Sequence, residues 1–324
     1  MYSNLRLLII TIVLVLVSHG AAAASYPYPL QDFRVESQQQ TLTMRYLDVE
    51  PQSGTPDRGT ALLLHGKNFC ADYWVDTIEL LRGQGYRVVV PEQIGFCSSD
   101  LPHRYQYSFH QLANNTRALL DALGIDQTIV VAHSMGGMLG TRYALKYPAA
   151  VQRLVLVNPI GLEDWIKLGV PHTPVDEAYA AERKKDFESI KQYQLRSYYD
   201  GQWSPAYERW ARRLASLYEG ERGEAVAWSQ ALTYDMLQTQ PVVHEFADLA
   251  VPTLLIIGQR DRTAPGRNKA PEAVARSLGD YPQLGRKAAK AIPNAELVEF
   301  DGLGHLPQIE DFDRYAEALT DYLR

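Results

Sequence analysis

The order of apolar and polar positions along the chain predicts short buried strands that alternate with longer helices. Runs of Val, Leu and Ile typical of buried strands are followed by stretches whose apolar residues recur every three or four positions, as in amphipathic helices. We expect one or two strands within 31–48 and further strands at 61–64, 87–90, 128–132, 151–157, 253–257 and 296–300. We expect helices at 73–82, 109–123, 136–146 and 312–323. Strands and helices that alternate in this way form a mostly parallel sheet with helices on both faces, so the pattern predicts an α/β fold.

This alternation is interrupted between two of the expected strands. Residues 161–248 contain no apolar strand-like run but are rich in charged and aromatic side chains, which predicts several amphipathic helices. The strand pattern resumes at Thr253. We therefore expect one α/β core, formed by residues 25–160 and 249–324, with a helical insertion over 161–248, rather than two domains end to end.

The first 24 residues have the pattern of a signal peptide. Arg6 is the only charge before an apolar run over 7–17, and the small residues at 22–24 read Ala-Ala-Ala, which suits a cleavage site. We expect cleavage and export to the periplasm or the cell exterior. Because the apolar segment as far as Ala24 approaches the roughly 20 residues that span a bilayer, an uncleaved membrane anchor is the alternative.

Export changes the interpretation of the two cysteines, Cys70 and Cys97. Each lies a few residues after an expected strand, and an oxidising compartment allows a disulfide between the two loops. Two unpaired, partly buried thiols are the alternative. The sequence leaves both open because a disulfide requires a specific separation of the two residues in space.

The composition is that of an ordinary soluble globular protein. The 324 residues include 32 Lys and Arg against 38 Asp and Glu, so the formal net charge is −6. The composition, with 46% hydrophobic and 22% charged residues, excludes a disordered chain and a collagen-like repeat. The mild acidity disfavours nucleic acid and anionic membrane surfaces as partners. We expect membrane contact only through the N-terminal segment. The eight histidines show no paired spacing typical of a metal site, so we expect neither a metal nor a cofactor.

The strongest chemical signal is a serine between a buried strand and the start of a helix. Residues 130–137 read Val-Val-Ala-His-Ser-Met-Gly-Gly, which places small residues two positions before and two positions after Ser134. This is the arrangement of the nucleophile elbow G-x-S-x-G, with Ala132 in place of the first glycine. The turn presents the serine at a helix N-terminus, where negative charge is stabilised. The alternative is a serine that only caps the helix.

Two further residues complete a candidate triad. A serine hydroxyl is a weak nucleophile and needs a base, and the base needs an acid that orients it. Asp261 follows the strand at 253–257, and His305 follows the strand at 296–300 in a Gly-Leu-Gly-His-Leu-Pro segment. Ligand sites of open α/β sheets form on such loops, after the carboxyl ends of strands. The chain order Ser134, Asp261, His305 is the order expected for this kind of elbow.

The loop after the first buried strand of the alternating region is a candidate oxyanion hole. It reads His-Gly-Lys-Asn. Acyl transfer places a negative charge on the carbonyl oxygen, which two backbone amides stabilise. We expect these to be the amides of Lys67 and Met135, with Asn68 as a less favoured donor. We expect His65 to hold the loop and His133 to be structural, because adjacent residues at a strand end point to opposite faces.

Together these motifs resemble the α/β-hydrolase superfamily, over essentially everything after residue 30. The resemblance implies that Ser134 is the nucleophile, His305 its base and Asp261 the partner of the base. It also implies that Lys67 and Met135 provide the oxyanion amides. Residues 91–99 are similar to the family's D-x-x-G-x-G-x-S loop but depart from it at Glu92 and Cys97, which supports a special role for Cys97. Relatives carry a helical cap over the site where residues 161–248 lie. The long gap before His305 predicts an extra loop or helix within 262–291.

The residue at the elbow restricts the reaction. Relatives that open epoxides or displace halides have an aspartate there, whereas serine with a histidine base suits attack on a carbonyl carbon. We expect hydrolysis of a small-molecule or lipid carboxylic ester through an acyl-enzyme, with aromatic side chains of the cap lining an apolar acyl pocket. The alternative for these aromatics, which we expect for most of them, is the packed core of the cap helices. The resemblance also admits C–C bond hydrolysis of diketones, amide hydrolysis and peptidase activity. A fold that binds a ligand without turnover is the alternative outside enzymes.

Overall fold

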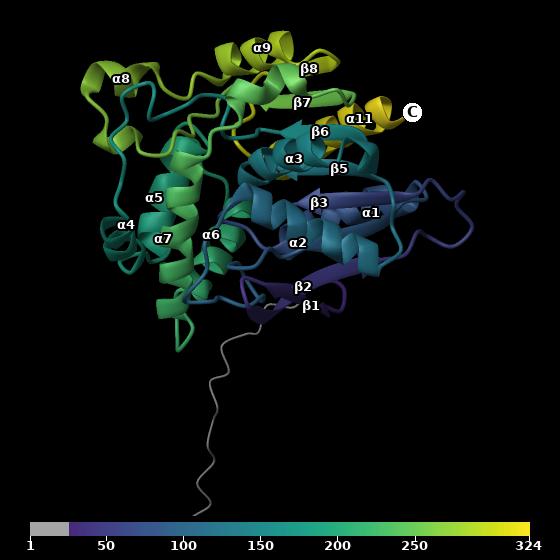
Figure 1. Cartoon of the computed structure of the whole chain (residues 1–324). Coiled ribbons are helices and arrows are strands. Elements are labelled where there is room, and N and C mark those ends of the chain that lie inside the picture. Colours follow the sequence, from purple (N-terminus) through teal and green to yellow (C-terminus); the bar gives the residue numbers. More distant parts are fainter. Residues whose placement is uncertain (1–25) are drawn as a thin grey trace, which may run out of the picture.

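Within the described residues, 26–324 of the computed structural model, the centre of the protein is an eight-stranded sheet with the order β1-β2-β4-β3-β5-β6-β7-β8 (Figure 1). Strand β2 is antiparallel to β1 and β4, and all other neighbours are parallel. The predicted mostly parallel sheet is therefore confirmed. The strands are β1 (Gln31–Ser37), β2 (Gln40–Val49), β3 (Thr60–Leu64), β4 (Arg87–Pro91), β5 (Thr128–His133), β6 (Val151–Val157), β7 (Thr253–Gly258) and β8 (Ala295–Phe300).

The alternation of side chains along each central strand divides the hydrophobic core into two layers. In β3, Leu62 and Leu64 belong to one buried cluster, whereas Ala61 and Leu63 belong to the other. This follows from the two-residue period of a strand, and because both faces are covered each strand is apolar throughout. One layer contains residues of α2 (Phe109–Ala122), α3 (Met135–Lys146) and α9 (Tyr281–Ala291), and the other contains residues of α1 (Val75–Gly83) and α11 (Phe312–Leu323).

The segment between β6 and β7 forms the predicted helical insertion. Its helices stand together on the left of Figure 1, beyond one end of the strands. We refer to residues 161–248 as the cap, and these limits stay a prediction. The cap contains α4 (Val175–Glu182), α5 (Phe187–Ser197), α6 (Pro205–Leu217), α7 (Gly223–Thr239) and the 3-10 helix η3 (Val243–Asp248).

The cap is held to the core by its aromatic side chains. Tyr199 and Trp210 belong to the buried cluster that contains residues of α1 and α11, and Trp165 belongs to the other cluster. The buried face of α7 differs, because it carries polar side chains. These buried polar residues are Ser229, Gln230, Thr233 and Gln238. Trp165, Tyr199 and Trp210 thus serve packing, as expected for most of the cap aromatics, and the apolar acyl pocket stays a prediction.

Short elements complete the chain and refine two predictions. The helix predicted at 73–82 begins as a separate 3-10 turn, and the segment 262–291 adds helices beside β7 as expected. No helix among residues 26–324 is long and apolar enough to cross a membrane. The leader predicted at 1–24 lies outside the described residues. The short elements are η1 (Ala71–Trp74), η2 (Pro148–Ala150), η4 (Arg267–Lys269), α8 (Glu272–Ser277) and α10 (Pro307–Glu310).

Candidate active site

Ser134 lies in a strained turn between β5 and α3. Its backbone angles are φ 57° and ψ −120°, which a residue with a side chain rarely adopts. The turn also brings the helix close to β3. A Cβ atom added at Gly136 would lie only 2.2 Å from the carbonyl oxygen of Leu64. The glycine two positions after the serine is therefore required by this packing. Ser134 is buried, with 5% of its surface exposed.

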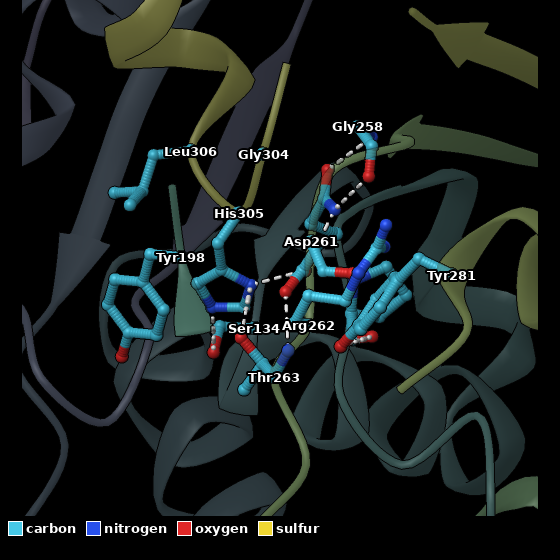
Figure 2. A network of polar contacts seen from close by, with 12 residues as sticks. Ser134, Tyr198, Gly258, Asp261, Arg262, Thr263, Tyr281, Gly304, His305 and Leu306 are labelled. Atoms are coloured by element: carbon cyan, nitrogen blue, oxygen red, sulfur yellow. Dashed lines mark hydrogen bonds and ion pairs between the residues drawn. The ribbon is translucent and has the colours of Figure 1, made fainter. Parts of the chain in front are cut away.

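His305 joins the serine to an acid on a third loop (Figure 2). Its Nε2 lies 2.9 Å from Ser134 Oγ, and its Nδ1 lies 2.6 Å from Asp261 Oδ2. Because the carboxylate accepts from Nδ1–H, the neutral imidazole has a lone pair on Nε2 for the serine hydroxyl. The structure therefore brings together the three residues of the predicted triad, with Asp261 and His305 fully buried.

Asp261 is fixed by donors from two neighbouring segments. Asn158, directly after β6, donates from Nδ2 to Asp261 Oδ2 at 2.9 Å, and the amide of Thr263 donates to Oδ1 at 2.8 Å. Asn158 Oδ1 also accepts from the amide of Gly258, at the end of β7. One side chain thus connects the ends of two adjacent strands and orients the carboxylate toward His305.

The loop that carries His305 is attached to a buried glutamate. Glu310, on α10, accepts hydrogen bonds from the amides of Gly304 and Leu306 at 3.0 and 3.1 Å. Burial raises the pKa of Glu310, and these two amides partly oppose the rise. Arg260 donates to the same carboxylate at 3.1 Å. The amides on both sides of His305 are therefore held in place by one side chain.

His133, the residue before Ser134, is hydrogen-bonded to the backbone of His305. Its Nε2–H donates to the carbonyl oxygen of His305 at 2.9 Å, and its Nδ1 accepts from the Tyr73 hydroxyl at 3.1 Å. The Tyr73 oxygen in turn accepts from the amide of Gly66 at 3.3 Å. Burial, followed by the proximity of the His305 ring, lowers the pKa of His133 well below its ordinary value, so this ring stays neutral. Its place agrees with the structural role predicted for it.

The loop after β3 passes directly over the nucleophile. A Cβ atom added at Gly66 would lie 3.0 Å from Ser134 Cβ, so only a glycine allows this approach without displacement. Met135 is the first residue of α3, where backbone amides have no acceptor within the helix. Among the hydrogen bonds of residues 26–324, none is donated by the amide of Lys67. Both amides stay candidates for the oxyanion hole.

His65 holds this loop against the loop after β4. Its Nδ1–H donates to the Gly66 carbonyl oxygen at 2.9 Å, and its Nε2 accepts from the amide of Gln93 at 3.1 Å. Burial lowers the pKa of His65 to about 4. Among the described residues, the ring of His65 makes no hydrogen bond to Ser134. This agrees with the prediction that His65 is not the base.

Comparison with known proteins identifies the family. Residues 61–312 match the family described as alpha/beta hydrolase fold. This chain belongs to the α/β-hydrolase family. A curated relative, 2-hydroxymuconate semialdehyde hydrolase of Pseudomonas putida, is 26% identical over 275 residues, or 81% of this chain and 86% of the relative. Lipase 1 of Psychrobacter immobilis is 25% identical over 280 residues, 83% of this chain and 78% of that protein.

A solved structure is considerably more similar to this α/β hydrolase. It is the crystal structure of a probable hydrolytic enzyme from Pseudomonas aeruginosa PAO1, with 52% sequence identity and a TM-score of 0.90. The alignment covers 93% of this chain and 96% of that one. The names of these relatives agree on hydrolysis and differ on the bond that is cleaved.

One cap residue of the hydrolase contacts the base directly. The ring of Tyr198, at the end of α5, stacks on the imidazole of His305 with centroids 4.3 Å apart and 25° between the planes (Figure 2). The Tyr198 carbonyl oxygen accepts from the amide of His305 at 2.9 Å. Its hydroxyl accepts from Asn68 Nδ2 at 2.7 Å. Asn68, predicted as a less favoured oxyanion donor, is thus bonded to the cap.

The two cysteines are joined in a disulfide beside the site. Cys70 and Cys97 have an S–S distance of 2.00 Å, and the bond links the loop after β3 to the loop after β4. The nearby Glu92 is fully buried and accepts from the amides of Ala71 and Ser98 at 3.0 and 2.8 Å. Burial raises the pKa of Glu92, and its hydrogen bonds partly oppose the rise. Both departures from the family's loop motif therefore serve this junction of the two loops.

Sequence reasoning missed three residues that hold the triad. Asn158 had a usable signal, because it is a polar residue directly after a strongly apolar strand. Glu310 and Tyr198 had none, since their partners are set by the folded chain rather than by local spacing. The residues that were predicted lie together after the carboxyl ends of β3, β5, β7 and β8, where the fold places a ligand site.

Proposed function

We propose that this α/β hydrolase is a serine hydrolase that cleaves carboxylic esters through an acyl-enzyme. The observation that carries the proposal is the hydrogen-bonded chain from Ser134 Oγ through His305 to Asp261, with distances of 2.9 and 2.6 Å. A serine with a base in reach, and a base oriented by a buried carboxylate, is the arrangement that nucleophilic acyl transfer requires.

In the acylation step Ser134 Oγ forms a bond to the ester carbonyl carbon while His305 Nε2 takes the serine proton. The carbonyl oxygen becomes an oxyanion, which the amides of Lys67 and Met135 stabilise. His305 then gives this proton to the alkoxide oxygen as the C–O bond breaks, and the alcohol leaves. Asp261 stays ionised throughout and keeps the imidazolium in place.

In the deacylation step water replaces the serine as nucleophile. His305 Nε2 takes a proton from the water as its oxygen forms a bond to the acyl carbon. The collapse of the second intermediate returns the proton to Ser134 Oγ and releases the carboxylic acid. The same two amides stabilise both oxyanions, so their loss slows both steps.

The cap meets the loop over Ser134 through polar contacts, which favours esters with short or polar acyl groups. Gln230 lies within hydrogen-bonding distance of the Lys67 side chain, so the buried polar face of α7 is close to the loop over Ser134. Buried amide and hydroxyl groups accommodate a long hydrocarbon chain poorly. We therefore propose a small-molecule ester rather than a long-chain lipid as the substrate.

A series of p-nitrophenyl esters tests this proposal. We expect a burst of p-nitrophenol equal to the enzyme concentration, and a kcat/KM that falls as the acyl chain lengthens from acetate to palmitate. Ser134→Ala should abolish the burst and lower kcat/KM by a factor of about 10³ or more. Absence of a burst together with equal rates for wild type and Ser134→Ala would contradict a serine nucleophile and favour a fold that only binds a ligand.

Hydrolysis of a carbon–carbon bond is the second candidate. It is favoured by the name of the relative from Pseudomonas putida, 2-hydroxymuconate semialdehyde hydrolase, and the same triad serves both reactions. The two candidates differ in the leaving group, which is an alcohol in one case and a stabilised carbanion in the other. A kcat/KM for a dienol diketone at least 100 times that for the best ester would overturn the ester proposal.

We also propose that the mature enzyme works outside the cytoplasm. The Cys70–Cys97 disulfide supports this, because such bonds persist mainly in oxidising compartments. Expression of the full chain in a Gram-negative host should give a periplasmic protein that begins at Ser25. A membrane-bound protein of full mass would favour the anchor instead, and a cytoplasmic protein of full mass would contradict export.

A further inference from the structure

Lys67 carries both a candidate oxyanion amide and a buried side chain that reaches the cap. The ammonium nitrogen donates to Gln230 Oε1 on α7 at 2.6 Å and to Glu182 Oε1 at the end of α4 at 3.4 Å. Only 10% of the Lys67 side chain and 8% of the Glu182 side chain are exposed. We refer to these two hydrogen bonds as the Lys67 tether. They join one residue of the core to two separate helices of the cap.

The anionic end of this tether is itself fixed by the cap. Glu182 Oε2 accepts from Lys185 Nζ at 2.7 Å and from the Tyr218 hydroxyl at 2.6 Å. These groups come from the segment after α4 and from the end of α6, so the tether ends in a point where several cap segments meet. Lys67 is linked to this point by a buried ion pair with an N–O distance of 3.4 Å.

The charges of the pair persist at neutral pH. Burial lowers the pKa of Lys67 to about 8, with a smaller opposing effect from Glu182. Burial disfavours the anion of Glu182, but Lys185, Lys67 and the Tyr218 hydroxyl outweigh it and lower its pKa to about 2. Because both charged groups are largely shielded from bulk water, each is held in the orientation that its protein partners set.

The next residue of the loop makes a second bond to the cap. Asn68 donates to the hydroxyl of Tyr198, the residue whose ring stacks on His305. Two consecutive residues of the loop over Ser134 are therefore bonded to cap segments more than a hundred residues away. The rest of the loop is fixed by His65 and by the disulfide, and the Cys97 carbonyl oxygen of the disulfide also accepts from Arg222 of the cap, at 3.1 Å.

We propose that Lys67 is a positioning residue that couples the cap to the oxyanion hole: its side chain is held by α4 and α7, and this sets where its backbone amide points. The inference rests on the proposed function, since an oxyanion forms only if Ser134 attacks a carbonyl group. Closing the cap over a substrate would then also complete the stabilisation of the intermediate. A displacement of reacting groups by about 1 Å can cost a factor of about 100 in rate.

The test measures kcat and KM for an ester and for the matching thionoester, whose sulfur accepts hydrogen bonds more weakly than oxygen. Lys67→Met keeps the unbranched chain as far as Cε and the backbone amide but removes the ammonium group and with it the tether. We expect kcat for the ester to fall about 10- to 100-fold with KM changed less than 3-fold. The thionoester should lose much less, so the ester to thionoester rate ratio should fall at least 5-fold. Lys67→Arg should restore part of the ester rate.

A matched control comes from another lysine that bonds to α4. Lys269, in η4, donates to Glu177 Oε1 at 2.7 Å and to Thr173 Oγ1 at 2.9 Å, so it also attaches the cap but does not belong to the loop over Ser134. Lys269→Met should leave the ester rate within 2-fold and the rate ratio unchanged. Gln230→Leu removes the shorter of the two hydrogen bonds of the tether and leaves the one to Glu182, so it should lower the ester rate and the rate ratio in the same direction, by no more than Lys67→Met. The double variant should lose no more than the larger single loss, because both changes break one connection.

Three outcomes would overturn the proposal. Equal losses for the ester and the thionoester, or a loss matched by Lys269→Met, would show a general effect of cap stability and overturn the proposal. A loss below 3-fold in Lys67→Met would overturn it as well. If Lys67→Met does not fold, Gln230→Leu and Lys67→Arg give the same comparison. Failure of the proposed function is distinguished because wild type would then give no burst with p-nitrophenyl esters.

Discussion

At the scale of single residues, the buried carboxylate of Asp261 decides how His305 works. Asp261→Asn keeps the size of the side chain and the bond to Thr263, but it replaces an acceptor facing His305 Nδ1 by an amide. An amide that donates there stabilises the wrong tautomer, so we expect kcat to fall about 10³- to 10⁴-fold. Steady-state kinetics on an ester and a thermal melt check this. A loss below 10-fold in a folded variant would contradict the role of Asp261.

The two neutral histidines behind the site predict a loss of stability in acid. Burial lowers the pKa of His65 to about 4 and that of His133 well below its ordinary value, whereas both titrate near 6.5 in the unfolded chain. As the pH falls from 6.5 toward 4, the unfolded chain binds the additional protons. The free energy of unfolding should therefore fall by about 1.4 kcal/mol per pH unit for each histidine, and the full stability is present above pH 6.5.

Denaturant titrations at pH 7.0, 6.0 and 5.0 measure this slope. His65→Gln offers one donor and one acceptor in place of those of the ring, for Gly66 and Gln93. It should be less stable than wild type at pH 7 but should show a shallower decline in acid. An unchanged slope in this variant would contradict a neutral, buried His65.

The residue scale also shows how far the sequence could predict the site. Ser134, Asp261 and His305 follow strands that are recognisable from their apolar runs, so the loops that carry them could be predicted to converge. Glu310 and Tyr198 could not be found, because their role depends on where α10 and α5 come to lie. The sharp turn at Ser134 was predictable from the small residues two positions before and after it, whereas its φ of 57° is seen only in the structure.

At the scale of elements, the contact between α3 and β3 fixes the position of the nucleophile. In Gly136→Ala the new Cβ would meet the Leu64 carbonyl oxygen at 2.2 Å, so the helix must move away from the strand. We expect a loss of about 1–3 kcal/mol in stability and of about 100-fold in kcat. Gly83→Ala, at the exposed end of α1, is the control, because its nearest neighbour would be 3.7 Å away. It should gain up to about 1 kcal/mol and keep full activity.

The disulfide connects two loop elements and should stabilise the fold substantially. Cys70 and Cys97 are separated by 27 residues, and closing a loop of this length in the unfolded chain contributes about 3–4 kcal/mol. Cys70→Ala, Cys97→Ala and the double variant should therefore lose nearly the same amount in denaturant titrations, since each breaks one bond. Losses below 1 kcal/mol, or losses that add in the double variant, would contradict this account.

At the scale of the whole molecule, the succession of strands and helices along the chain was predictable, but the way in which the cap attaches to the core was not. Each central strand is buried on both faces, so local apolar runs identified the strands to within two residues. The cap packs onto the core through contacts between distant segments, such as Asn68 with Tyr198, which no local pattern predicts. The acyl pocket was expected from the aromatic composition of the cap and from the family resemblance, with most of the rings expected to form the core of the cap helices. Trp165, Tyr199 and Trp210 do pack in the core, and α7 adds buried polar side chains that no local pattern predicted.

The central claim is that one buried serine becomes acylated because His305 and Asp261 activate it. Incubation of the leader-less protein with an alkyl fluorophosphonate, followed by intact-mass measurement and peptide mapping, tests this claim without a known substrate. We predict one adduct per chain, located on Ser134, with no adduct on Ser134→Ala and labelling at least 100 times slower in His305→Gln. No adduct on wild type, or an adduct on any other residue at the same rate in Ser134→Ala, would contradict the account.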